Sequence, residues 1–131
     1  MNRIDNFEYK ITLPYIACFL DTDGTIGMFK CHHIKMFKYK YVYVYIKLYF
    51  YNTNKNILGI IQKFLRSGKI YKRPIKDRLA KKETYVLMIN KQKDCERILR
   101  KVLPYLFIKK TKAEECLNYL MKIKRQKVKH L

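Results

Sequence analysis

Two carboxylates stand two positions apart at the end of an apolar run near the N-terminus. The run is Ile16–Leu20, the acids are Asp21 and Asp23, and Gly24 follows directly. Carboxylate oxygens are the ligands that hard divalent cations prefer, and such a cation activates water and stabilises the leaving oxygen when a phosphodiester is cleaved. These residues are therefore candidates for metal-assisted chemistry on phosphate.

A short helix has to position the two acids. Thr12 fits its N-cap, Pro14 fits its first turn, where a missing N–H costs little, and Gly24 fits a left-handed residue after its last turn. The helix is apolar all round, so we expect it to be buried. Acids at a helix C-terminus face the negative end of the helix dipole, at a cost of roughly 0.3–1 kcal/mol each. A cation at this end would offset that cost.

The strongest feature of the composition is a net charge of +20, from 30 Lys and Arg against 10 Asp and Glu. A folded domain with this charge repels itself unless it meets a polyanion. Nucleic acid is favoured over an anionic membrane surface, because no single basic amphipathic helix stands apart from the rest. Abundant Lys, Ile, Tyr and Asn are typical of AT-rich codons, which favours an intracellular protein encoded in an organelle such as a mitochondrion or chloroplast. Codon bias is an alternative source of some of the lysine.

At 131 residues and 49% hydrophobic composition, we expect one domain, 1–131, with one core. No apolar run approaches the ~20 residues that span a bilayer, and the N-terminus has no signal-peptide or transit-peptide pattern. The four cysteines form no CxxC pair, so we expect buried free thiols rather than zinc ligands or disulfides: Cys18, Cys31, Cys95 and Cys116. Cys31, His32 and His33 are not expected to share a metal, because neighbours on a strand point to opposite faces.

The clearest periodic pattern is a strict alternation over Tyr41–Phe50. Its period of two predicts a strand with one aliphatic face toward the core and one tyrosine and lysine face turned outward. Further patterns predict strands at Thr25–Lys40, Lys69–Arg73 and Tyr85–Ile89, and helices at Ile57–Leu65, at Lys91–Leu103 and after a capping box of Thr111 and Glu114. The order αββαββα(α) predicts an α+β domain, in which one antiparallel four-stranded sheet carries its helices on one face.

The nonapeptide IACFLDTDG, Ile16 to Gly24, resembles in register the signature of the LAGLIDADG homing endonucleases. Element order, length and positive charge agree with that family, and the resemblance covers nearly the whole chain. It implies a saddle-shaped sheet and a site-specific double-strand DNA endonuclease that uses Mg²⁺, or another divalent cation such as Mn²⁺, for intron homing. Because the chain has a single motif, it also implies a homodimer on a long near-palindromic site, with the signature helices packed together through Ile16, Ala17, Cys18, Phe19 and Leu20.

The resemblance also implies roles for individual residues. Asp23, at the eighth position of the signature, would be the metal-binding carboxylate together with backbone carbonyls near Gly24, whereas Asp21 would be structural. Lys109 stands five residues after Pro104, the spacing of a family lysine that stabilises charge on the phosphate or polarises the water. The alternative is that Lys109 contacts backbone phosphate.

Two further positions are less typical of the family. Asn52 best matches a Gln or Asn that positions solvent at the end of the second strand, and its alternative role is that of a turn former or helix cap. Cys18 replaces the usual glycine at the third signature position. A bulkier residue there changes how closely two signature helices approach each other.

The resemblance further implies that the outward sheet face reads DNA in the major groove. Direct readout requires donors and acceptors at base edges, and the candidates are His33, Lys35, Lys47 and Arg73, with Tyr41, Tyr43, Tyr45, Tyr49 and Tyr71 offering hydroxyls and rings to thymine methyls. An exposed tyrosine-rich face without a partner is the alternative. The basic tail Lys122–Lys129 is expected to contact phosphate, which positions without specifying. Two other functions stay open: an intron RNA maturase, and a catalytically silent DNA- or RNA-binding module of the same fold.

Overall fold

The computed structural model describes residues 11–34, 40–73 and 82–129, with the side chains of 30–34, 40–43 and 124–129 left aside. The elements follow the predicted order. They are α2 (Leu13–Asp23), β1 (Gly24–Ile34), β2 (Lys40–Asn52), α3 (Lys55–Leu65), β3 (Lys69–Lys72), β4 (Tyr85–Ile89), α4 (Gln92–Val102), the 3-10 turn η1 (Leu103–Tyr105) and α5 (Lys110–Lys129). The predicted α+β class is confirmed.

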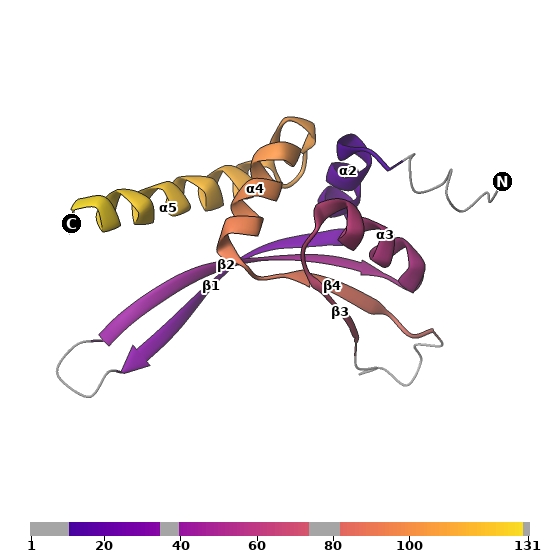
Figure 1. The fold of residues 1–131 in the computed structure, drawn as a ribbon, viewed down its shortest axis with the longest axis horizontal. Helices are drawn as coiled ribbons and strands as arrows, with labels where there is room; N and C mark the ends of the chain where they lie inside the picture. The colour runs from indigo at the N-terminus through magenta and orange to yellow at the C-terminus, as the bar shows by residue number, and fades with distance from the viewer. Residues whose placement is uncertain (1–10, 35–39, 74–81, 130–131) are drawn as a thin grey trace.

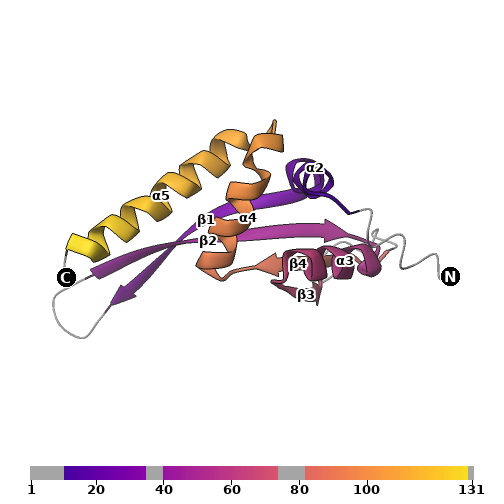
Figure 2. The same ribbon diagram turned by 45° about the horizontal axis from the view of Figure 1, so that its top comes forward.

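The four strands form one antiparallel sheet in the order β1-β2-β4-β3. Figures 1 and 2 show all four helices on one side of this sheet, while no helix of the described chain covers the other side. The long β1–β2 hairpin and the β3–β4 pair project in different directions, and α5 extends along the same side as the β1–β2 hairpin (Figure 1). The sheet is therefore bent, with one covered and one open face.

Alternation in β2 separates the two faces of the sheet, as the sequence predicted. Ile46, Leu48 and Phe50 are fully buried under the helices. Leu48 pairs with Ile89 and Phe50 pairs with Leu87, both of which are also fully buried. Burying each such side chain contributes about 1.5–3 kcal/mol, so this central pair of strands anchors the core beneath α2, α3 and α4.

Polar side chains fix the elements on either side of β2. Asn54 caps α3, because its side-chain oxygen accepts hydrogen bonds from the N–H groups of Asn56 at 2.9 Å and Ile57 at 3.3 Å. At the start of α4, the side-chain amide of Gln92 accepts the Ile46 N–H at 2.8 Å and donates to the Ile46 carbonyl at 2.9 Å. Gln92 thus continues the ladder on β2 beyond the last residue of β4.

Two local features differ from what the sequence pattern indicates. Phe64 shares the helical spacing of the apolar residues Ile57 and Ile61 of α3, which are buried, but is itself 42% exposed. The capping box is also misplaced, because α5 begins at Lys110 and the N–H of Ala113 bonds to the carbonyl of Lys109 at 2.9 Å. Thr111 therefore lies inside the first turn of α5 and does not cap it.

Two of the cysteines belong to the core. Cys95 and Cys116 are fully buried free thiols, and burial raises the pKa of both, that of Cys95 to about 12. The Cys95 thiol donates to the carbonyls of Ile46 and Ile89, each at 3.4 Å. Cys18 is free and exposed, while the side chain of Cys31 lies outside the described residues. The three described cysteines are free, as predicted, but the predicted burial is wrong for Cys18.

The helices of the described chain were also compared with the length and apolarity that a membrane span requires. Not one of them meets both requirements.

Candidate active site and nucleic-acid face

The helix α2 carries the signature residues and packs its apolar side into the core. Thr12 is its N-cap, as predicted, and accepts the N–H of Tyr15 at 3.3 Å. The helix ends at Asp23, which is exposed, and the chain passes without a loop into β1 at Gly24. The last turn of α2 is thus held between the core and the first strand.

Gly24 is required for a different reason from the one predicted. Its backbone is extended, with φ −112° and ψ −176°, so the left-handed conformation expected from the sequence is wrong. A Cβ atom at this position would lie 2.7 Å from the Tyr49 carbonyl oxygen and 2.8 Å from Leu20 atoms. Only glycine lets β2 pass this close to the last turn of α2.

Asp21 is buried, and the chain itself neutralises its unfavourable position at the helix end. Its Oδ2 accepts the N–H groups of Phe107 at 3.1 Å and Ile108 at 3.0 Å, and its Oδ1 accepts that of Lys109 at 2.8 Å. Burial alone would raise the pKa of Asp21, but these three N–H groups, with the nearby Lys109 ammonium, hold it below its ordinary value. The unfavourable position of Asp21 at the negative end of the helix dipole led us to infer a cation. For Asp21, these N–H groups and the Lys109 ammonium offset that cost without a metal.

Lys109 lies at the same end of α2, because it belongs to the segment whose N–H groups bind Asp21. Its ammonium Nζ donates to the backbone carbonyl of Asp21, in addition to the bond from its N–H to the carboxylate. A positive charge beside the last carbonyls of a helix is favourable because it meets the negative end of the dipole. The structure thus brings Lys109 to the helix end where Asp23 is exposed, although 86 residues separate the two.

Of the three-residue segment Phe107–Lys109, the sequence analysis selected only Lys109 and missed the role of the other two residues. No pattern marks three successive N–H groups as ligands of a distant carboxylate. The signal that was available is the pair Phe107 and Ile108, two apolar residues in a connection between helices. They are 88% and 74% exposed, since their N–H groups rather than their side chains hold the segment in place.

Asn52 is occupied by local structure. Its side-chain oxygen accepts the N–H of Asn54 at 2.8 Å, the turn-forming role that the sequence left open. It pairs with Tyr85, and its position in the alternation of β2 puts it on the same face as Phe50, beneath the helices. The structure does not bring it onto the open face.

The register of the sheet defines the open face. Tyr49 pairs with Thr25 on one side and with Met88 on the other, and Met88 pairs with Lys69. The predicted DNA-reading residues Tyr45, Lys47, Tyr49 and Tyr71 lie on this face by the same alternation. The side chains of His33, Tyr41 and Tyr43, and Lys35 altogether, lie outside the described residues.

Aromatic rings form a continuous row on the open face. Phe29 lies 5.8 Å from the ring of Tyr45 and 6.3 Å from that of Tyr49, and Tyr49 stacks on Tyr51 with centroids 6.0 Å apart. Phe29 and Tyr51 were not predicted as members of this face. Tyr51 continues the alternation of β2 by one step, so the periodic pattern was a signal that could have found it.

Cations lie over the rings of this row. The Lys47 ammonium is 5.3 Å from the ring centre of Tyr45, and the Arg73 guanidinium is 5.2 Å from that of Tyr51. Cation–ring contacts of this length hold a basic group in place on a surface. The open face therefore presents apolar rings, hydroxyls and positioned cations together, a combination suited to nucleic acid.

The predicted contact surface of α2 needs correction. Four of its five residues are buried in the chain's own core: Ile16, Ala17 and Leu20 are 0% exposed and Phe19 is 9% exposed. Only Cys18 is accessible. The face that α2 presents outward is made by Tyr15, Cys18 and Thr22, whose spacing of three and four residues places them on one side of a helix.

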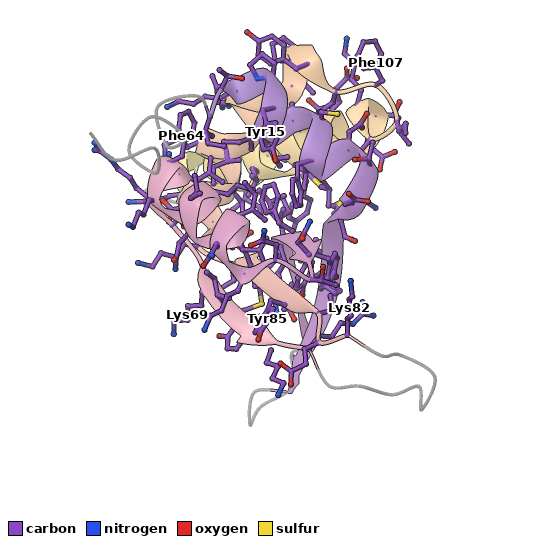
Figure 3. All side chains as sticks on the ribbon, turned by 90° about the vertical axis from the view of Figure 1, so that its right-hand side faces the viewer. Tyr15, Phe64, Lys69, Lys82, Tyr85 and Phe107 are labelled. Atoms are coloured by element: carbon purple, nitrogen blue, oxygen red, sulfur yellow. The ribbon has the colours of Figure 1, made fainter. Side chains whose placement is uncertain are left out.

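This end of the molecule also exposes other apolar side chains. Tyr15 and Phe64 are each 42% exposed, and Phe107 is 88% exposed. Figure 3 looks onto the end where α2 and α3 lie, and shows Tyr15 and Phe64 on it with Phe107 at its upper margin. Exposed apolar side chains gathered from three elements are typical of a surface that meets a partner.

Comparison of the sequence with models of protein families and with curated proteins gives no match in either case. The structure does match solved proteins. The homing endonuclease I-CvuI, in complex with its target and Ca, has a TM-score of 0.70 and 24% identity over 96% of this chain and 73% of that chain. The archaeal intron-encoded homing endonuclease I-Vdi141I, complexed with DNA, has a TM-score of 0.65 and 17% identity, covering 90% of this chain and 71% of that chain.

The LAGLIDADG meganuclease I-CpaMI, bound to uncleaved DNA, is similar to this chain with a TM-score of 0.65 and 17% identity. The match covers 88% of this chain and 38% of that protein. All three similarities cover 88% or more of this chain, as expected from a resemblance that covers nearly the whole chain. The chain therefore has the fold of the LAGLIDADG homing endonucleases.

Proposed function

We propose that this chain is a site-specific double-strand DNA endonuclease that acts as a homodimer with a divalent cation, Mg²⁺ or Mn²⁺. The observation that carries the proposal is the end of α2, where Asp23 is exposed and Lys109 is bound to the carbonyl of Asp21, two residues earlier in the chain. The +20 charge and the open face of rings and cations support DNA as the substrate. The DNA complexes of I-CvuI, I-Vdi141I and I-CpaMI support the same choice.

The donor set at the end of α2 fits a hard cation. It offers the carboxylate of Asp23 and backbone carbonyl oxygen near Gly24, and oxygen ligands suit Mg²⁺ rather than a soft metal. The described residues contain no group of three or more metal-ligating side chains, so one chain supplies an incomplete site. Asp23 of a second copy would supply the missing carboxylate. A bound cation of this kind supplies charge neutralisation and an activated water for phosphodiester hydrolysis.

Lys109 and Asp21 would support this site from the chain's own side. An ammonium group has three N–H donors, and one is taken by the Asp21 carbonyl. The other two are available to a phosphate oxygen at the position where negative charge develops during cleavage. Asp21 acts only by positioning, because its carboxylate is buried and already holds three N–H groups.

A second copy would bind the outward face of α2 and the exposed apolar side chains near it. Tyr15, Cys18 and Thr22 follow one another along α2 toward the end that a second Asp23 has to approach. The exposed side chains of Phe64 and Phe107 extend this surface. Cys18, at the usual glycine position, is small enough for helices to pack closely, and it lies on the face where they would meet.

The test uses the purified chain, Mg²⁺ and a library of DNA duplexes with a randomised central segment, from which cleaved ends are sequenced. The wild type is expected to cut both strands at a recurring sequence. Asp23→Asn should keep DNA binding and lose cleavage by roughly 10²–10³-fold or more, the loss typical of removing one group that stabilises transition-state charge. Glu114→Gln on α5 is the matched control, since it removes an exposed carboxylate elsewhere.

Cleavage that survives Asp23→Asn would show that Asp23 does not hold the metal. Duplex binding without any cut product at any concentration of Mg²⁺ or Mn²⁺ would identify a catalytically silent binding module. Binding restricted to structured RNA would identify a maturase.

A further inference from the structure

A basic depression lies away from the end of α2, between the C-terminus of α3, the start of β3 and the start of α4. It has a volume of about 420 Å³, and its positively charged lining residues are Lys63, Arg66, Lys69 and Lys91. One acid, Asp94, also lines it. One carboxylate cannot balance four cations, so the depression carries an excess of positive charge.

Asp94 is engaged with other groups. Its Oδ2 accepts the Ser67 hydroxyl at 2.6 Å, and its Oδ1 lies 3.6 Å from the Arg97 guanidinium. Arg97 in turn donates to the Leu65 carbonyl at 2.7 Å, so Asp94 and Arg97 together tie α4 to the end of α3. Within the described part of the chain, the structure records no ion pair for Arg66, Lys69 or Lys91. Among the described residues, these three cations are thus not neutralised by an acid and can accept an anionic partner.

Arg66 holds its place in an unusual backbone conformation. Its φ of 55° and ψ of 40° are left-handed, and it is the only residue other than glycine with a positive φ in the described chain. This position after a helix normally belongs to glycine, which adopts the conformation without strain. A strained residue at a surface position indicates a role for its side chain.

The depression lies beside the open face of the sheet. β3 is an edge strand, and its first residue, Lys69, pairs with Met88 of the open face. Figure 3 shows Lys69 at one side of the molecule, with Lys82 on the other. Three strand spacings of ~4.8 Å make the sheet about 14 Å across, close to the ~12 Å width of a major groove. A sheet seated in that groove brings its edge strand against a phosphate backbone.

We propose that Arg66, Lys69 and Lys91 form a phosphodiester-binding site along the β3 edge. It holds the sugar–phosphate backbone of one DNA strand while the open face lies in the groove. The site rests on the proposed function for its substrate, double-stranded DNA. It contacts phosphate only, so it contributes affinity and register without sequence preference.

Arg66→Gly is the decisive variant, because glycine relieves the backbone strain and removes the charge at the same position. Binding to a duplex of arbitrary sequence is measured without divalent metal at 50 mM and 200 mM salt, alongside thermal unfolding. We expect the variant to be at least as stable as the wild type and to bind more weakly. One lost phosphate contact lowers the salt slope by about 0.9, so the ratio of wild-type to variant affinity should be about threefold larger at 50 mM than at 200 mM.

Two further variants complete the test. Lys91→Ala, which removes no side-chain cap of α4, should behave like Arg66→Gly. Lys101→Ala, at an exposed position near the end of α4 and outside the depression, should leave the salt slope unchanged. An Arg66→Gly protein with the wild-type slope would overturn the proposal, as would an equal loss of slope in Lys101→Ala. An Arg66-dependent slope in a protein that cuts no DNA would support this site and refute the nuclease.

Discussion

The carboxylate of Asp21 holds the connection between η1 and α5, and replacing it with asparagine tests that role. Asparagine has nearly the same shape but keeps one acceptor oxygen and replaces the other with an NH₂ group, which cannot accept. Three N–H groups now end on this carboxylate, two on Oδ2 and one on Oδ1. In Asp21→Asn at least one N–H group loses its partner and the other bonds lose their charge.

The magnitude follows from these bonds. A hydrogen bond to a charged group contributes about 1.5–3 kcal/mol, whereas a neutral one contributes about 1 kcal/mol, and an N–H group left without a partner costs a further 1–3 kcal/mol. Part of the last loss is relieved because the exposed connection admits water. We therefore expect Asp21→Asn to lower the free energy of unfolding by about 2–4 kcal/mol at pH 7.

The effect has a pH signature with a definite sign. The pKa of Asp21 is lower in the folded chain than its ordinary value of 3.8, so the charged form stabilises the fold. This contribution is complete above the ordinary pKa and is lost as the pH falls through the folded value. The difference between wild type and Asp21→Asn should thus be constant from pH 7 to about 5 and shrink below about pH 4.

Urea unfolding followed by circular dichroism at pH 7, 5 and 3 measures the difference directly. Glu114→Gln, the same chemical change at an exposed position of α5, is the control and should shift stability little at any of these pH values. The reasoning is refuted if Asp21→Asn costs less than about 1 kcal/mol at pH 7, since a hydrogen bond to charge is worth more than that. A difference that grows as the pH falls would refute the pKa direction.

Two further predictions concern the same end of α2. Gly24→Ala should destabilise the chain by about 1–3 kcal/mol, the range for overpacking, because the added methyl group meets the Tyr49 carbonyl at 2.7 Å; thermal unfolding measures this, and an unchanged midpoint would contradict the close approach. Oxidation of a Cys31→Ser protein should form a reducible covalent dimer through exposed Cys18, and adding Cys18→Ser should abolish it, because the other two cysteines are buried. A dimer in solution that never cross-links would place the contact on another face.

The sequence predicted the elements well wherever periodicity is strict. The alternation of Tyr41–Phe50 identified the two faces of β2, and Leu48 and Phe50 are buried as it requires. The apolar signature also predicted the helix, but its expected burial is correct for one side only, since Tyr15, Cys18 and Thr22 are exposed. It could not say which side of α2 stays exposed, because a helix that is apolar all round carries no amphipathic signal. Burial of Ile16 and Leu20 and exposure of Tyr15 depend on how the sheet and α4 surround the helix.

In the candidate site, too, the sequence selected some residues correctly but could not predict the contacts between distant segments. The resemblance to the family signature selected Asp23 and Lys109, and Lys109 binds the end of α2 at which Asp23 is exposed. The three N–H groups that bind Asp21 could not be predicted, because nearly every residue carries a backbone N–H group and no sequence pattern marks the ones that bind a side chain. Gly24 was selected correctly but explained wrongly, since a close approach between β2 and α2 leaves no local signal. Arg66 was missed because a basic residue after a helix is ordinary until its φ is known.

One short segment joins Lys109 to Asp21, and this contact has a consequence for the proposed catalysis. The N–H groups of Phe107 and Ile108 hold the segment on Asp21, and Lys109, which follows directly, donates its ammonium to the Asp21 carbonyl. The position of the Lys109 charge relative to Asp23 therefore depends on a carboxylate that never meets the substrate. Under the proposed nuclease activity, both Asp21→Asn and Lys109→Met should slow cleavage of bound DNA, while Asp23 still binds the cation. Loss of rate in both variants, with DNA affinity kept and metal dependence unchanged, distinguishes a misplaced lysine from a lost metal ligand.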